Sequence, residues 1–141
     1  MALERSFRFE TKQLEEKIRK RLAETPLAER SIMRQIAVFI EKEAKLRAPV
    51  DQGFLTADIH NMVADTGHGF AAVVYVPVNC PSAQYATAMH ENHYNLGPNS
   101  LVKQTKVGVT VGRKYLSRAI HENQDGIMKR IAFQLKKWGW K

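Results

Sequence analysis

The first part of the chain has apolar residues at helical spacing. They recur every four residues from Leu14 to Leu22 among Lys, Arg and Glu, which predicts a helix within residues 1–24. Its apolar stripe is narrow, so this helix is either peripheral or docked on a neighbouring subunit. A wider stripe follows and predicts a second helix. Its apolar positions are Ile32, Ile36, Phe39, Ile40 and Ala44.

Prolines mark both ends of this second helix. Thr25 and Pro26 are typical of an N-cap followed by the first helical position, where a missing N–H costs nothing. Pro49 disfavours a helical backbone at the residue before it, so the helix is predicted to end near Arg47. The following Asp51-Gln52-Gly53 is turn chemistry, because Asp can bond its own backbone and Gly tolerates positive φ.

The middle of the chain alternates in the manner of strands. Residues 59–64 and 70–76 flank Asp65-Thr66-Gly67-His68-Gly69, which predicts two antiparallel strands and a loose hairpin, the second strand being apolar on both faces and central in its sheet. One or two helical turns are predicted over residues 85–91 and a polar loop over 92–102. Alternation over residues 105–111 predicts a third strand, which Gly112 ends.

A last long helix is predicted by a sustained stripe with Gly126 inside it, so that Asp125-Gly126 is either a kink or a break. The stripe consists of Leu116, Ile120, Ile127, Ile131, Leu135 and Trp138. The fold class is therefore α+β: a small antiparallel sheet of three to four strands packed against N-terminal helices and a long C-terminal helix. We expect a single domain over residues 1–141, with an α+β core over 26–138.

Charge is distributed unevenly along the 141 residues, whose net charge is +8. Residues 48–102 contain no Lys or Arg and four acidic residues, whereas residues 103–141 contain ten Lys or Arg and two acidic residues. Such unlike regions suit either pairing between copies of the chain or contact with nucleic acid through the basic end. The candidate interface residues are Lys103, Lys106, Arg113, Lys114 and Arg118.

Neither a disulfide nor a membrane segment is predicted. The single cysteine cannot form an internal disulfide, and no apolar run approaches the roughly 18 residues that a membrane span needs. We therefore expect a soluble protein, made in a cytoplasm, with no membrane partner.

Candidate chemistry is sparse. His90-Glu91-Asn92-His93 contains three possible metal ligands and leaves a metal-dependent hydrolase open, but its histidines are three residues apart rather than the four of a zinc helix. Ser117 has no evident base in the sequence, and no phosphate-binding glycine loop is present. No catalytic residue, metal site or cofactor is predicted.

Three segments resemble one family, the tail-completion or neck proteins of long-tailed bacteriophages, of the type named after a lambdoid tail component. The first is the corner after the second helix, with Ala48, Pro49, Asp51, Gly53, Leu55 and Ile59. The second runs from Tyr85 to Glu91, and the third, which leads into the last helix, contains Leu116 and Ala119. They occur in the family's order over roughly residues 30–138.

The resemblance implies a structural virion protein that catalyses nothing. Proteins of this kind are tail terminators or head–tail joining subunits, which form rings between the head connector or stopper and the tail tube. The ring expected here is a hexamer, built partly by residues 103–118 and the first helix. It is assembled in the host cytoplasm, with passing contact to DNA in its channel. The alternative that the charge pattern leaves open is a small basic nucleic-acid-binding protein.

Overall fold

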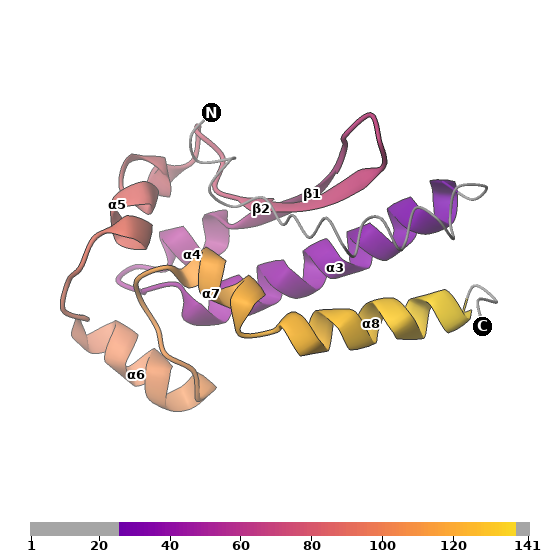
Figure 1. Ribbon diagram of the computed structural model, residues 1–141. Helices are drawn as coiled ribbons and strands as arrows, with labels where there is room; N and C mark the ends of the chain where they lie inside the picture. Colours follow the sequence, from indigo (N-terminus) through magenta and orange to yellow (C-terminus); the bar gives the residue numbers. More distant parts are fainter. Residues whose placement is uncertain (1–25, 138–141) are drawn as a thin grey trace.

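The computed structural model describes residues 26–137, and helix α3 (Pro26–Arg47) is its central element (Figure 1). Proline stands at the first helical position, and Lys45 and Arg47 occupy the last turn, where they complement the helix dipole. The apolar stripe faces inward: Ile36 and Ile40 are fully buried and Phe39 is partly buried. The predicted second helix is therefore confirmed. The predicted first helix, residues 1–24, lies outside the described residues.

The hairpin consists of β1 (His60–Asp65) and β2 (Phe70–Tyr75), which pair antiparallel with His60 opposite Tyr75 and Asp65 opposite Phe70. Its turn is closed by the main-chain N–H of Thr66, which donates to Gly69 O at 2.9 Å. One face of β2 contributes Ala72 and Val74 to the core next to α3. Both predicted strands are confirmed to within about a residue.

The prediction of three to four strands is wrong for the part of the chain that the structure describes, where the sheet has two strands. Residues 98–107 form helix α6 (Pro98–Val107) instead of the second half of a polar loop and the start of a third strand. Proline occupies its first turn, and Gly108 follows its end with φ 73°. These two signals start and stop a helix, and they outweigh the strand preference of the alternating Thr and Val residues. With only two strands in this sheet, β2 is not a central strand as predicted.

Short helical elements fill the space between the hairpin and α6. They are α4 (Phe54–Asp58), the 3-10 helix η1 (Pro81–Gln84) and α5 (Ala86–Glu91). The Asp58 carboxylate accepts hydrogen bonds from the main-chain N–H and the hydroxyl of Ser82, at 2.9 and 2.7 Å, and so ties α4 to η1. The helical turns predicted over residues 85–91 correspond to α5, whereas α4 was not predicted.

The last helical region is divided into α7 (Tyr115–His121) and α8 (Gln124–Lys137). The break lies at residues 122–123, where the Asn123 side-chain amide donates to Ala119 O at 2.9 Å. It comes just before the Asp125-Gly126 position at which a kink or break was predicted. Gly126 instead lies within α8, against Phe39 of α3, whose ring would be 3.8 Å from a Cβ at this position.

The elements are arranged around α3 (Figure 1). The hairpin lies on one side of α3, and α8 runs along the other side, while α4, α5 and α6 gather beyond its C-terminal end. The last helices therefore pack on α3 rather than on the sheet. Among residues 26–137, no helix is long and apolar enough to cross a membrane.

Candidate functional site

The corner after α3 is a rigid turn. Ala48 and Pro49 are buried, and the N–H of Ala48 still donates to Ala44 O at 2.9 Å, so the helical hydrogen bonding ends there. Gly53 has φ 86°, a left-handed conformation that favours glycine, and its carbonyl accepts from the N–H of Ala57 at 3.0 Å. The chain then enters α4, whose Leu55 side chain is buried. The predicted turn, with positive φ at Gly53, is confirmed.

Lys103 of α6 is turned inward onto this corner. Its ammonium donates to the main-chain carbonyls of Lys45 and of Ala48, the latter at 2.7 Å, and lies 3.4 Å from the Thr56 hydroxyl. A helix leaves its last carbonyls without intrahelical partners, and Lys103 satisfies two at the end of α3. Burial lowers the pKa of this amine from 10.5 to about 8.

Ser100 provides a second link between α6 and the corner. The main-chain N–H of Val50 donates to the Ser100 hydroxyl oxygen at 2.8 Å, and this hydroxyl donates to Val50 O at 3.1 Å. Ser100 is 3% exposed, so both main-chain groups are satisfied away from water. Helix α6 therefore holds the corner in place through side chains rather than through an apolar face.

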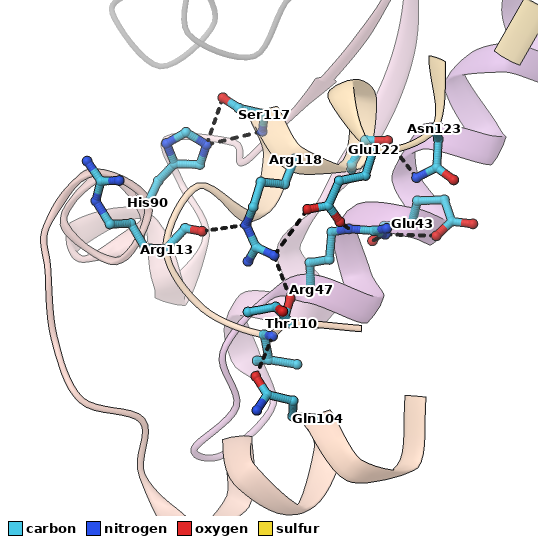
Figure 2. A network of polar contacts seen from close by, with 12 residues as sticks. Glu43, Arg47, His90, Gln104, Thr110, Arg113, Ser117, Arg118, Glu122 and Asn123 are labelled. Atoms are coloured by element: carbon cyan, nitrogen blue, oxygen red, sulfur yellow. Dashed lines mark hydrogen bonds and ion pairs between the residues drawn. The ribbon is translucent and has the colours of Figure 1, made fainter. Parts of the chain in front are cut away.

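The second and third segments meet at His90, at the C-terminal end of α5. The main-chain N–H of Ser117 donates to Nε2 of His90 at 3.3 Å, so this nitrogen is the acceptor of a neutral imidazole (Figure 2). The proton of the ring therefore lies on Nδ1, which donates to Glu91 Oε1 at 2.8 Å. The ring is 1% exposed and meets Tyr115 edge to face, with centroids 5.0 Å apart.

Burial lowers the pKa of His90 below its ordinary value of 6.5 and outweighs the hydrogen bond to Glu91, which acts in the opposite direction. Glu91 is held from its other side by Lys114, whose ammonium donates to Oε2 and whose main-chain N–H donates to His90 O at 2.8 Å. The hydrogen bond from Lys114, followed by that from His90, lowers the pKa of Glu91. His90 thus satisfies a free N–H in the first turn of α7, and Lys114, with φ 59°, precedes that turn.

Two arginines connect the third segment to the rest of the fold. Arg118 donates from Nε to Arg113 O at 2.9 Å and from Nη1 to Thr110 O at 2.7 Å (Figure 2). Its Nη1 also lies 3.6 Å from Glu122 Oε2, and the other oxygen of Glu122 accepts from Arg47 Nε at 2.9 Å. The Arg47 side chain is only 4% exposed and forms a second ion pair with Glu43, which lies one turn earlier in α3. The ends of α3 and α7 are therefore joined through charged groups.

The chemistry available at His90 is limited. Ser117, His90 and Glu91 stand in the order nucleophile, base and carboxylate, with the Ser117 hydroxyl 3.4 Å from Nε2. However, Nε2 also accepts the Ser117 N–H, so this nitrogen is already engaged. No group of three His, Cys, Asp or Glu residues among the described positions could hold a metal, and His93 is exposed. His90 and Glu91 join the end of α5 to Lys114 and to the start of α7.

Sequence reasoning missed the base next to Ser117 and the inward position of Lys103. His90 and Ser117 are 27 residues apart and Lys103 is 55 residues from Ala48, and no local pattern relates residues at such separations. Of the other candidate interface residues, Lys106 is exposed, whereas Lys114 is tied to Glu91 and Arg118 to Thr110. Arg113 donates from Nε to Glu91 O at 2.9 Å.

A cleft of about 500 Å³ opens beside the corner. Its walls come from residues 49–55, from α5 and the residue before it, and from residues 94–100. Phe54 and Tyr85 are 47% and 39% exposed, and Met89 and Tyr94 complete an aromatic and apolar lining. Concave apolar sites of this size are where proteins bind ligands or partner segments.

Comparisons of the chain with protein-family models, with curated proteins and with solved structures found no match.

Proposed function

We propose that this chain is a structural subunit of the virion of a long-tailed bacteriophage, a tail-completion or neck protein. The observation that carries the proposal is that the second and third of the segments resembling that family are joined by direct hydrogen bonds, and that the residue before the first segment is bonded to the residue before the third. Arg47 O, just before the first segment, accepts from the N–H of Gly112 at 2.8 Å, just before the third. Tyr115 of the third donates its hydroxyl to Ala86 O of the second at 2.9 Å.

These contacts matter because short motifs that match independently need not share a place in a fold. Here buried residues from all three segments, among them Ala48, Ala86, Leu116 and Ala119, belong to one core cluster. Their joint use in one structural unit supports a common origin for the three matches. It also supports the proposal that the chain is not an enzyme, since the most reactive residue types in these segments are engaged in holding the unit together.

The proposed assembly is a homo-oligomeric ring, a hexamer, located between the head connector or stopper and the tail tube, either as a tail terminator or as a head–tail joining subunit. DNA would pass through the channel of the ring. A ring needs a heterologous interface in which two different faces of the subunit meet. The unlike charges of residues 48–102 and 103–141 provide such faces.

The test is to examine the purified protein by light scattering and negative-stain microscopy, alone and mixed with tail tubes. We expect rings, or particles that cap tube ends. The charge-reversal variant should use exposed cations such as Lys106, because Lys103 and Lys114 make internal contacts whose loss would also destabilise the fold. A protein that remains monomeric under all these conditions would contradict the proposal.

A small basic nucleic-acid-binding protein is the second candidate, favoured by one observation. Helix α8 exposes four cationic side chains, Lys129, Arg130, Lys136 and Lys137, around the exposed ring of Phe133. Cations beside an aromatic ring suit phosphate contact and base stacking. A DNA-binding assay across salt distinguishes the candidates: steep salt dependence by a protein that never assembles supports nucleic-acid binding.

A further inference from the structure

The outer face of α8 carries an apolar side chain surrounded by positive charge, which we name the Phe133 patch. Phe133 is 63% exposed, the largest exposed fraction among the large apolar side chains of the described residues. Cations stand three and four residues before it and three and four after it, on the same face of the helix. The patch consists of Lys129, Arg130, Phe133, Lys136 and Lys137, all of them exposed.

No acidic residue of the described chain neutralises this patch. No acidic residue occurs between Gly126 and Lys137, and none of the four cations forms an ion pair with a residue in the range 26–137. Arg130 lies over the ring of Phe39, 4.0 Å from its centroid, which fixes one edge of the patch against α3. An exposed aromatic side chain ringed by cations is suited to burial against a surface that is apolar at its centre and negative at its rim.

The cleft beside the corner has these complementary properties. All its lining residues fall between positions 49 and 100, where the chain has no Lys or Arg, and Asp51 is its one charged lining residue. Phe54 and Tyr85 present exposed aromatic surface to it. Burial raises the pKa of the Tyr85 phenol, and the negative charges of Asp58 and Asp51 raise it further. The cleft is therefore lined by aromatic side chains, and its one charged lining residue, Asp51, is negative.

The two surfaces lie at opposite ends of the molecule, with the C-terminal half of α8 at one end and α4, α5 and α6 at the other (Figure 1). One copy cannot bring its own patch to its own cleft, but two copies can meet head to tail. We propose that the Phe133 patch of one copy docks in the cleft of the next, and that this contact is the heterologous interface of the assembly. The inference rests on the proposed ring and names its two faces.

The test uses one variant for each face. The patch variant carries Phe133→Ser, Lys129→Glu and Lys136→Glu, and the cleft variant carries Asp51→Lys, Phe54→Ser and Tyr85→Ser. All these side chains are exposed, so folding should be preserved, and circular dichroism checks it. The matched control, Val38→Ser with Lys42→Glu, changes an exposed apolar residue and an exposed cation on α3 and should assemble as the wild type does.

We expect each variant alone to be monomeric by light scattering and sedimentation. An equimolar mixture should form heterodimers and nothing larger, since it retains one intact patch and one intact cleft per pair. If the variants assemble like the wild type, or if the mixture stays monomeric, the inference is wrong while the proposed function stands. A wild type that never assembles, even with tail tubes, overturns both. If that monomer also binds DNA and the patch variant does not, the patch is a nucleic-acid site.

Discussion

The ammonium of Lys103 lies 2.7 Å from the main-chain carbonyl oxygen of Ala48, across 55 residues of sequence. This contact joins α6 to the end of α3 and turns a residue from the basic end of the chain into an internal support. A cation that donates hydrogen bonds to the carbonyls at a helix end stabilises the fold. Lys103 therefore has a structural role, unlike an exposed surface cation.

Replacing Lys103 with Met should lower the free energy of unfolding by about 1 to 3 kcal/mol, because two carbonyls at the end of α3 lose their partner. Urea unfolding followed by circular dichroism measures the change. Lys106→Met is the control, since Lys106 is exposed on the same helix and should change little. Equal stability of the two variants would show that the carbonyls find other partners.

The lowered pKa of the Lys103 amine predicts that stability depends on pH. Its pKa is about 8 in the fold against 10.5 ordinarily, so between these values the unfolded chain binds a proton that the folded chain has released. Stability contributed by this group therefore rises as pH increases from about 8 towards 10. The difference in unfolding free energy between the wild type and Lys103→Met should grow across that window. A constant difference would contradict the assignment.

His90 is expected to make the stability depend on pH in the acidic range. Burial holds its pKa below 6.5, so below pH 6.5 the unfolded chain takes up a proton that the folded chain does not, and stability falls as the pH drops. His90→Gln keeps an acceptor that can reach the Ser117 N–H and removes the titration, so unfolding midpoints between about pH 5 and 7 should vary less than in the wild type. His93→Gln, the same replacement at an exposed histidine, is the matched control.

Ser117 should be unreactive although it stands next to His90 and Glu91. We expect no labelling by a fluorophosphonate reagent, because the Ser117 N–H occupies Nε2 and His90 is 1% exposed. Ser117→Ala should also keep nearly all of the stability, since the hydroxyl contact is long at 3.4 Å and the N–H remains. Stoichiometric labelling lost in Ser117→Ala would contradict the non-enzymatic proposal.

Gly53→Val should destabilise the protein by about 1 to 3 kcal/mol through backbone strain alone. Gly53 has φ 86°, and no atom lies within 4 Å of where a Cβ would stand, so crowding adds nothing. Gly97→Val is the matched control, because Gly97 also has open space but an ordinary φ of −75°. Melting temperatures measure both, and a Gly53→Val variant that melts with the wild type would refute the strain at this turn.

The amino-acid sequence by itself determined the elements whose signals are local. The apolar stripe and the two prolines of α3, the alternation of β1 and β2, and the glycine of the Asp51-Gln52-Gly53 turn each act within a few residues, so pattern and propensity suffice. Residues 105–111 show where this fails: their alternation is strand-like, but a strand needs a neighbour to complete its hydrogen bonds, and helical signals at Pro98 and Gly108 prevailed.

Only the tertiary structure decided which side chains meet. The long-range partners of Lys103, His90 and Arg47 lie 27 to 75 residues away. Burial lowers the pKa of Lys103 and of His90, and the sequence alone does not show that burial. The cleft likewise forms from segments up to about 50 residues apart, and its separation from the Phe133 patch depends on how α6 and α8 leave the central helix. Charge and composition can be read from the sequence. The distances between the residues of a site depend on how the helices and the hairpin pack together.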